Sequence, residues 1–506
     1  MTRSAREVEL TLRLPAGGRA ILEANSVLAA ATPKQFHQVT TYFDTPDGVL
    51  NEAGLTLRVR RIGVNRIQTI KSLSNGRGVA RTRREWEWRI GQTTPDVGRL
   101  AKVRRLARVA SQIQDRLEPL FVTDIQRTAR TINLDDHTVI EAVIDEGTIE
   151  AGAGCEAVSE LELELKAGCV APMYRLAAEL QMTTPCWASP ESKFSRGLQL
   201  RTGHTASAHS PQTIPLRRRT LAADGFHQIL GGALGHLMAN IAPTLRGASE
   251  AVHQMRAGLR AARAALQLFE RHLDRTTVQG FDTRLQHFAQ IIGTARDWDV
   301  FCVQTLPAAA AELPANALRG LKSAAEVQRQ AAHAVVVKAV HGQAFTALVL
   351  RLAVWMEALA AQPSVLSNKR MGKRLRTLAP SLLNRVDRKA RNRARHVDRL
   401  SARELHSLRK SLRKLRYAVD CFSGLFRRHA VKAYCARCEQ PLELLGTIND
   451  AVVAQRLAEH LATNQRPDLR KSATILALWC KRRSRKARLG LKGALSSFRA
   501  APTFWS

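Results

Sequence analysis

Over residues 5–166, hydrophobic and polar positions alternate in short runs, the pattern of β-strands with one polar and one apolar face. The first run, residues 7–14, places Glu7 and Glu9 on one face and aliphatic side chains on the other. Further strands are predicted around residues 40–47, 55–60, 68–71, 83–89, 123–134, 137–145 and 159–166, and helices around residues 17–31 and 97–116.

The polar faces of these strands carry charges of both signs, which a face exposed to water would not require. Carboxylates such as Glu7 and Glu160 lie on the first and last strands, and basic residues such as Arg58 and Lys71 lie on strands between them. Mixed charges on the same faces of about eight antiparallel strands predict a closed barrel with a polar lumen. Residues 1–203 are therefore predicted to form an eight-stranded antiparallel β-barrel tunnel with flanking helices.

The pattern changes after residue 203. Residues 204–222 are polar, contain proline and lack periodicity, which predicts a linker. Residues 223–506 have helical spacing throughout and predict an all-α domain. The fold class is thus α+β, with a barrel followed by two duplicated helical bundles at about residues 223–360 and 361–506.

The duplication is visible as a motif that recurs 153 residues further along the chain. One histidine and three arginines fall on a single helical stripe in each copy: His253, Arg256, Arg260 and Arg263, then His406, Arg409, Arg413 and Arg416. Phe269 likewise recurs as Phe422, and residues 293–297 as residues 446–450. No carboxylate within either stripe relieves the repulsion between the arginines, so the two helices are predicted to form the walls of one basic groove.

The charge balance strengthens this prediction. Lys and Arg number 78 against 43 Asp and Glu, a net charge of +35, and most of the excess lies in residues 204–506. Such an asymmetry predicts a polyanionic partner for the second half. The eight cysteines are scattered, and Cys435 and Cys438 lack a second pair that would complete a metal site. Without a secretory pattern or a run near the roughly 18 apolar residues that span a bilayer, we expect a reduced cytoplasmic protein and no membrane.

The predicted tunnel contains acidic groups suited to a divalent cation and basic groups suited to phosphate oxygens. Over residues 5–202 the chain contains, in order, the segments Glu7-x-Glu9, Tyr42-Phe-Asp-Thr-Pro46, Leu57-Arg-Val-Arg60, Lys71, Glu85-x-Glu87, Arg127, Asp145-x-Gly147, Glu160-x-Glu162 and Ser192-Lys193-x-x-Arg196-Gly197. This set of motifs resembles that of the CYTH family of triphosphate tunnel metalloenzymes.

This resemblance implies a hydrolase that cleaves a phosphoanhydride bond of tripolyphosphate or a related triphosphate. It implies Mg²⁺ or Mn²⁺ bound by Glu7, Glu9, Glu160 and Glu162, with Asp145 in support. Triphosphate would be bound by Arg58, Arg60, Lys71, Arg127, Lys193 and Arg196, with Glu87 in support. The residues expected to act in catalysis are Glu7, Glu9, Thr11 and Lys71.

Position 11 departs from the family pattern. The family's opening motif is Glu-x-Glu-x-Lys, and here the third member is Thr11. The absent ammonium would contact phosphate or help to orient the attacking water, so the activity could be slowed, retuned or lost. Arg13 on the same face is a candidate replacement. We expect Thr11→Lys to raise the hydrolysis rate by restoring a positive charge.

The helical half resembles the CHAD domain over about residues 223–500, in both copies of its motif. The resemblance implies binding of inorganic polyphosphate and association with polyphosphate granules. The residues implied are His253, Arg256, Arg260, Arg263, His406, Arg409, Lys410, Arg413 and Arg416.

Three functions remain open from the sequence. The first is a metal-dependent triphosphatase with a polyphosphate-binding domain, and the second is a non-catalytic polyphosphate-binding protein whose tunnel is degenerate at Thr11. The third is nucleic-acid binding, which charge alone suggests. The 5% aromatic content leaves few stacking platforms, and no groove-entry motif is present, so specific nucleic-acid recognition is not expected.

Overall fold

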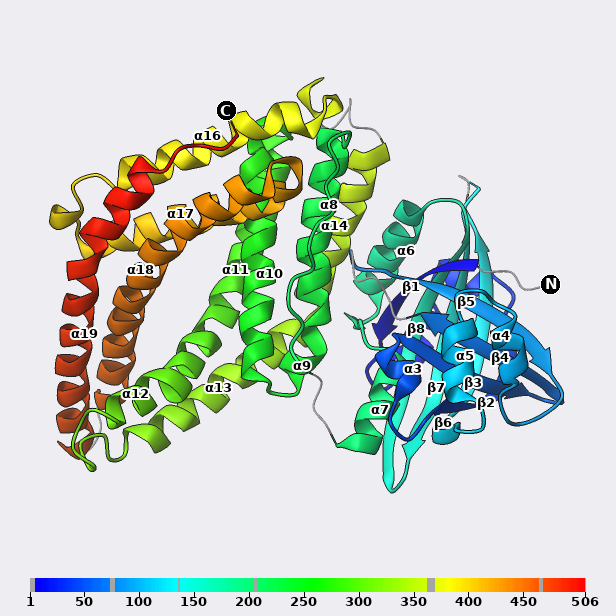
Figure 1. The fold of residues 1–506 in the computed structure, drawn as a ribbon. Coiled ribbons are helices and arrows are strands. Elements are labelled where there is room, and N and C mark those ends of the chain that lie inside the picture. The colour runs from blue at the N-terminus through cyan, green and yellow to red at the C-terminus, as the bar shows by residue number, and fades with distance from the viewer. Residues whose placement is uncertain are drawn as a thin grey trace. The chain divides into compact units, whose positions relative to one another are not determined.

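The computed structural model describes residues 5–72, 78–134, 137–203, 207–361, 369–463 and 467–505 (Figure 1). The first three residues of the predicted linker, 204–206, lie outside this set. The chain divides into two compact units. One unit contains residues 1–210, 234–251 and 340–357, and the other contains residues 211–233, 252–339 and 358–506.

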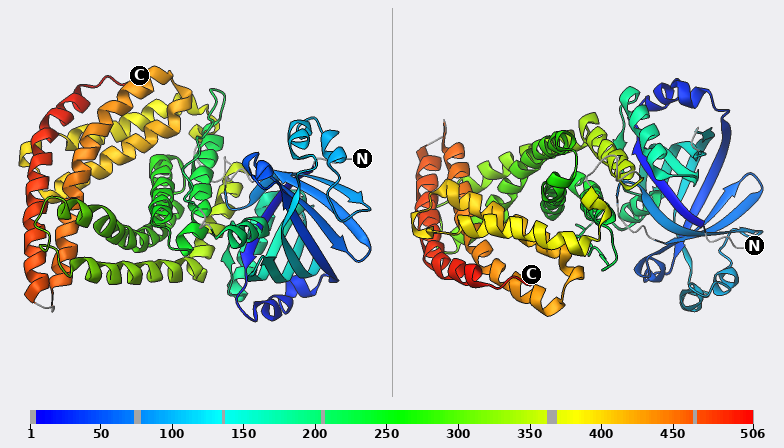
Figure 2. Two further views of the ribbon diagram at one scale, coloured as in Figure 1. Left: turned by 60° about the horizontal axis from the view of Figure 1, so that its bottom comes forward. Right: turned by 90° about the horizontal axis from the view of Figure 1, so that it is seen from above.

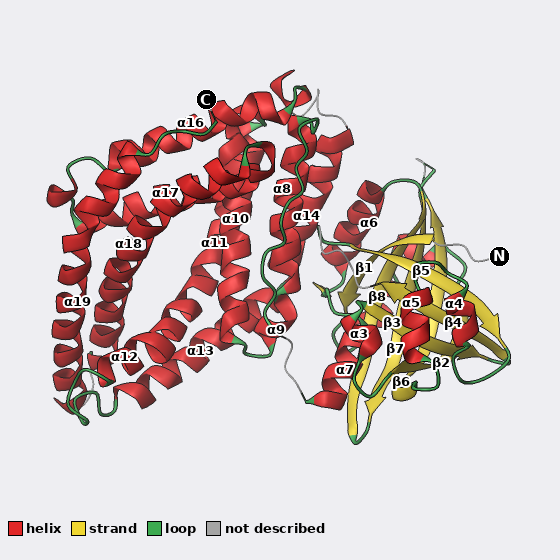
Figure 3. Cartoon of the chain, in the orientation of Figure 1, coloured by secondary structure: helices red, strands yellow, loops and turns green. Residues whose placement is uncertain are grey.

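Eight antiparallel strands close into a barrel, shown in yellow in Figure 3. They are β1 (Ala5–Arg13), β2 (Lys34–Asp44), β3 (Leu55–Ile62), β4 (Asn65–Ser72), β5 (Arg81–Ile90), β6 (Glu118–Asn133), β7 (Val139–Ala151) and β8 (Gly154–Ala167). Their order is β5-β4-β3-β2-β6-β7-β8-β1, and β1 also pairs with β5, which closes the barrel. A two-residue strand, β9 (Trp187–Ala188), pairs with the end of β1.

The strand alternation turns aliphatic side chains outward, where short helices cover them. Leu57, Ile70 and Trp86 form one apolar cluster with residues of these helices. The helices of this region are α1 (Gly18–Glu23), α2 (Ser26–Ala29), α3 (Val49–Glu52), α4 (Val97–Ala101), α5 (Ala107–Ile113), α6 (Val170–Thr183) and α7 (Lys193–Thr202). Residues 17–31 and 97–116 were each predicted as one helix. Each region contains two helices, and in the first the Asn25 side chain accepts the Val27 N–H and caps α2.

Helix α7 positions two site residues against the barrel. Ser192 caps its first turn, accepting the Ser195 N–H at 3.2 Å. At Gly197 a Cβ atom would lie 2.2 Å from the Phe121 ring, so only glycine allows the helix to approach this closely. This approach brings Lys193 and Arg196 to the carboxylates of β7 and β8.

The helical region repeats its elements with the period seen in the sequence. The repeated pairs are α8 (Ala222–Ala239) with α16 (Leu375–Arg393), α10 (Ser249–Phe269) with α17 (Ala402–Phe422), and α11 (Arg275–Val300) with α18 (Arg428–Ala462). The remaining elements are α9 (Ile241–Leu245), η1 (Glu270–His272), η2 (Phe301–Thr305), α12 (Leu306–Ala310), α13 (Leu321–His341), α14 (Gln343–Ala361), η3 (Lys369–Gly372), η4 (Val397–Arg399), η5 (Ser423–Leu425) and α19 (Pro467–Ala500). Two further views show α18 and α19 side by side (Figure 2). The predicted fold, a closed barrel followed by duplicated helical bundles, is confirmed.

One helix corrects an expectation from the sequence. By length and composition α14 could cross a membrane, with a mean hydropathy of 1.6 over its most apolar stretch. Half of that stretch is buried inside the structure, and core helices of soluble proteins meet the same criterion. The sequence was expected to contain no apolar segment long enough to span a bilayer, and α14 is such a segment. One helix of this kind is weak evidence for a membrane span.

Candidate active site and basic surface

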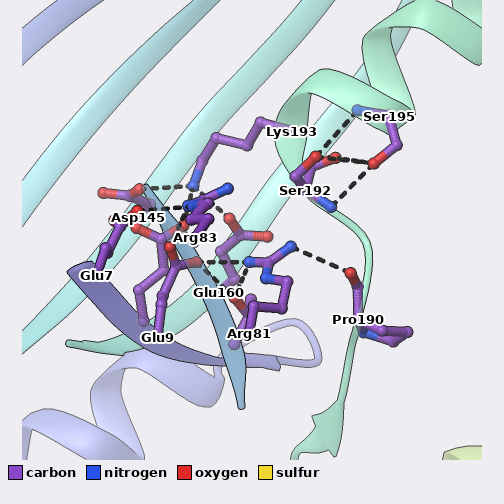
Figure 4. Close-up of polar contacts among 12 residues, drawn as sticks. Glu7, Glu9, Arg81, Arg83, Asp145, Glu160, Pro190, Ser192, Lys193 and Ser195 are labelled. Atoms are coloured by element: carbon purple, nitrogen blue, oxygen red, sulfur yellow. Dashed lines mark hydrogen bonds and ion pairs between the residues drawn. The ribbon is translucent and has the colours of Figure 1, made fainter. Parts of the chain in front are cut away.

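Three carboxylates from neighbouring strands meet inside the barrel. Asp145 of β7 and Glu160 and Glu162 of β8 each offer an oxygen within 4.8 Å of the others. The Lys193 ammonium from α7 contacts all three, at 2.8 Å from Asp145 and 2.9 Å from Glu162, and more closely at Glu160. Figure 4 shows Lys193 pointing to this cluster.

Two arginines neutralise the same carboxylates. The Arg127 guanidinium donates to both oxygens of Asp145 at 2.7 and 2.5 Å and to Glu162 at 3.1 Å. Arg196, whose side chain is 1% exposed, donates to Glu160 at 3.1 Å. Burial raises the pKa of Asp145, but Lys193 and Arg127 outweigh it and hold that pKa below its usual value. Asp145 is therefore ionised.

The adjacent strand, β1, contributes a second acidic pair. Glu7 accepts from Lys71 at 2.8 Å and from Arg83 at 2.6 Å. Arg83 also contacts Glu9, and Arg81 donates to Glu9 at 2.5 Å. Burial raises the pKa of Glu9, but these two arginines outweigh it and place that pKa well below its usual value. Figure 4 shows the side chains of Glu7 and Glu9 on the same side of β1 as this network.

The predicted phosphate-binding residues lie on the next strands around the barrel. Arg58 lies 3.8 Å from Glu85, and Lys71 also contacts Glu85 at 2.9 Å. Burial and the positive charges of Arg58 and Arg127 lower the pKa of Arg60 to about 10. A site crowded with cations in this way favours an anion. Glu87 accepts a hydrogen bond from Thr69 at 2.9 Å. It is not among the three carboxylates that meet in the cluster.

The sequence prediction omitted Arg81 and Arg83 from the site. Both lie on the lumen face of β5, in register with Glu9 and Glu7 respectively. The predicted strand began at Arg83, whereas β5 begins at Arg81. Extending the period-two alternation by two residues toward the N-terminus would have placed Arg81 on the same face as Arg83. Arg13, the candidate replacement for the missing lysine, instead pairs with Glu156 at 3.4 Å.

The carboxylate cluster fits a divalent cation by its chemistry, since hard cations prefer carboxylate oxygens. The ammonium of Lys193 contacts all three carboxylates, so a cation bound there must share the cluster with Lys193 or displace it. Asp145, Glu160 and Glu162 would hold this cation.

In the helical region the two basic stripes lie on equivalent helices, α10 and α17, and approach each other. Arg256 lies 3.6 Å from Asp297 of α11, and its equivalent Arg409 lies 3.9 Å from Asp450 of α18. Each guanidinium also lies over a helical glycine. A Cβ atom at Gly293 would be 3.6 Å from Arg256, and one at the equivalent glycine of α18 would be 3.9 Å from Arg409.

The arginines of the third motif position are Arg260 and Arg413. Among the described residues, no carboxylate lies within 4.0 Å of Arg260 or Arg413. Burial and the positive charges of Arg256, Arg409 and Arg296 lower the pKa of Arg260. The pKa of Arg413 is lowered in the same way, with Arg260 among the causes. The two stripes therefore contribute to one strongly positive surface. At its centre Arg260 and Arg413 have no ion-pair partner among the described residues, although Asp450 partly offsets the effect of the arginines on the pKa of Arg413.

The fourth motif position differs. Arg263 donates to Asp282 at 2.9 Å and to Gln286 at 2.9 Å. Arg416 pairs with Asp420 and, at 3.2 Å, with Glu439. These two arginines were predicted to bind polyphosphate, but their charges are already compensated by neighbouring acids.

The remaining predicted residues lie on the same two helices. His253 is on α10, and exposed Lys410 is on α17 beside His406. The imidazole of His406 contacts Asn449 at 3.0 Å. Burial and the charges of Lys410 and the neighbouring arginines lower the pKa of His406 despite that contact.

Comparisons with known proteins agree with both halves of this description. A CYTH domain model matches residues 5–198, and a CHAD domain model matches residues 228–459. Among curated proteins, the inorganic triphosphatase of Haemophilus influenzae is 28% identical over 195 residues, which are 38% of this chain and 54% of that protein. The chain thus spans about half the length of this relative.

A solved structure supports the assignment of the helical half. The crystal structure of the CHAD domain from the plant Ricinus communis is 26% identical, with a TM-score of 0.51, and the match covers 59% of this chain and 99% of that one. The barrel and the helical region each match one domain family. The chain carries a CYTH domain followed by a CHAD domain, as its sequence predicted.

Proposed function

We propose that the barrel is a metal-dependent inorganic triphosphatase and that the helical domain binds inorganic polyphosphate. The observation that carries the first proposal is the closed barrel in which Asp145, Glu160 and Glu162 lie within 4.8 Å of one another among buried cations. One lumen thereby combines ligands for a hard cation with donors for phosphate oxygens. The relative named as an inorganic triphosphatase supports hydrolase chemistry at the level of the CYTH family.

The basic residues of the barrel would have two roles, binding phosphate oxygens and neutralising the carboxylates. Arg58, Arg60 and Lys71 would hold the phosphate oxygens. Burial and neighbouring arginines lower the pKa values of Arg60 and Lys71, and the negative charge of a phosphate would offset that repulsion. Lys193 and Arg127 would neutralise charge next to the carboxylates. Mg²⁺ or Mn²⁺, when bound, would polarise a phosphate oxygen and lower the pKa of a water molecule bound to the metal.

The test is phosphate release from tripolyphosphate, nucleoside triphosphates and thiamine triphosphate, each with Mg²⁺ or Mn²⁺. We expect hydrolysis of at least tripolyphosphate, and loss of hydrolysis when a chelator removes the metal. If the folded protein releases no phosphate from any substrate with either metal, the non-catalytic alternative with a degenerate tunnel replaces this proposal.

The polyphosphate proposal rests on the surface formed by α10 and α17, where no carboxylate of the described residues lies within 4.0 Å of Arg260 or Arg413. A flexible chain with about one charge per phosphate would satisfy several such cations at once. The partner is therefore an extended polyanion rather than a specific nucleic-acid sequence. We further propose a cytoplasmic location at polyphosphate granules, and domain limits of 1–203 and 223–506 joined by the linker.

A further inference from the structure

The guanidinium of Arg81 lies beside Thr11, the position of β1 at which the family motif has a lysine. Arg81 is directly across from Glu9 in the β1–β5 pairing. Its Nη2 donates to the Thr11 hydroxyl at 2.6 Å and to Glu9 at 2.5 Å. Its Nη1 donates to the Pro190 carbonyl at 3.1 Å (Figure 4).

Thr11 fixes the position of this guanidinium by hydrogen bonding. Its hydroxyl accepts from Arg81 and donates to Glu9 at 3.1 Å, so the three groups form a closed set of hydrogen bonds. Thr11 is 2% exposed, and the Arg81 side chain is 11% exposed. The buried Nε of Arg81 has no hydrogen-bond partner among the described residues. A buried donor without a partner is unusual, and a phosphate oxygen would satisfy it.

We propose that Arg81 is a substrate-binding residue of the tunnel and that Thr11 holds it in place. The positive charge missing from position 11 is thereby supplied from β5. This inference rests on the proposed triphosphatase function. It reverses the expectation that Thr11→Lys raises activity, because an ammonium at position 11 would meet the Arg81 guanidinium and repel it.

The first test is a double-mutant cycle on tripolyphosphate hydrolysis. Arg81→Ala lowers kcat/KM by about 100-fold, the loss typical of one donor to the developing charge. Thr11→Lys lowers it by about tenfold, because the two cations compete for one place. The variant carrying both substitutions recovers to about tenfold below wild type, because the new lysine takes the vacated place. Arg84→Ala, an exposed arginine of the same strand, is the matched control.

Binding provides a second readout that does not depend on turnover. Calorimetry with tripolyphosphate in metal-free buffer gives a Kd that rises about tenfold or more in Arg81→Ala and stays at the wild-type value in Arg84→Ala. If Arg81→Ala does not fold, Thr11→Val, which keeps the shape and removes the hydroxyl, weakens binding severalfold.

The outcomes separate this inference from the proposed function. A wild-type protein that hydrolyses no triphosphate overturns the function itself. An active wild type in which Arg81→Ala matches Arg84→Ala, or in which Thr11→Lys fails to rescue Arg81→Ala, overturns the role of Arg81 alone. An unchanged Kd for tripolyphosphate in Thr11→Val overturns the role of Thr11 in positioning Arg81.

Discussion

The barrel and the helical surface both contain clusters of basic side chains, but the two clusters differ in how many carboxylates neutralise them. In the barrel Arg83, Arg127 and Lys193 each contact at least two carboxylates. On the helical surface Arg260 and Arg413 contact none within 4.0 Å among the described residues. Alternating charges suit a site that must hold a cation and an anion together, whereas an uncompensated surface suits the binding of a polyanion alone.

The same difference affects how each region tolerates substitution. Removing one partner of a buried ion pair leaves an uncompensated charge, at a cost of about 3–5 kcal/mol. Glutamates of the barrel are therefore best replaced by glutamine, which keeps their shape and still accepts hydrogen bonds through its amide oxygen. On the helical surface, removing an arginine relieves repulsion, so alanine is acceptable there.

The largest effect is expected from Glu160→Gln. It removes a charge from the carboxylate cluster and weakens the contacts to Lys193 and Arg196. We expect tripolyphosphate turnover to fall by about 1,000-fold at limiting metal. The measurement is the initial rate of phosphate release, with thermal melting to verify folding. Glu150→Gln, an exposed carboxylate of β7, is the control. Turnover within twofold of wild type in folded Glu160→Gln would exclude this cluster from catalysis.

A smaller effect, specific to the helical surface, is expected from Arg260 and Arg413. Replacing Arg260 and Arg413 by Ala weakens binding of long-chain polyphosphate by about 100-fold at low salt, since two charge-assisted contacts are lost. The slope of log affinity against log salt falls in magnitude by about 1.5, by analogy with nucleic-acid backbones. Tripolyphosphate hydrolysis in the barrel remains at the wild-type rate. A collapse of that hydrolysis in the folded variant would contradict the separation of the two functions.

The matched control comes from the fourth motif position. Arg263 and Arg416 belong to the same stripes but are already paired with acidic residues. Replacing both by Ala should weaken polyphosphate binding by only about two- to threefold, because compensated charges contribute little to the local potential. If this pair of substitutions weakens binding as much as Arg260→Ala with Arg413→Ala, compensation by neighbouring acids does not decide which arginines bind.

The sequence predicts the parts of the structure that depend on periodicity. Alternation along the strands predicts the barrel, and the 153-residue repeat predicts the duplicated helices. Both signals follow from which face of its own strand or helix each residue occupies, and the sequence shows this directly. The sequence does not show which polar side chains pair between different elements. The contact between Arg263 and Asp282 joins residues 19 positions apart on different helices, and the contact between Arg81 and Thr11 joins different strands.

The smallest predicted effect concerns pH. Burial and the charges of Lys410, Arg409 and Arg413 lower the pKa of His406, despite its hydrogen bond to Asn449. A bound polyanion reverses the field of these cations and raises that pKa, so the complex takes up a proton that the free protein does not hold. Affinity for polyphosphate therefore rises as the pH falls, by about three- to tenfold between about pH 8 and about pH 6. The measurement is a series of binding isotherms at constant ionic strength. His253→Ala with His406→Ala should remove the rise, whereas His429→Ala, outside the stripes, should preserve it. An affinity that rises equally in the double histidine variant would assign the proton uptake to other groups.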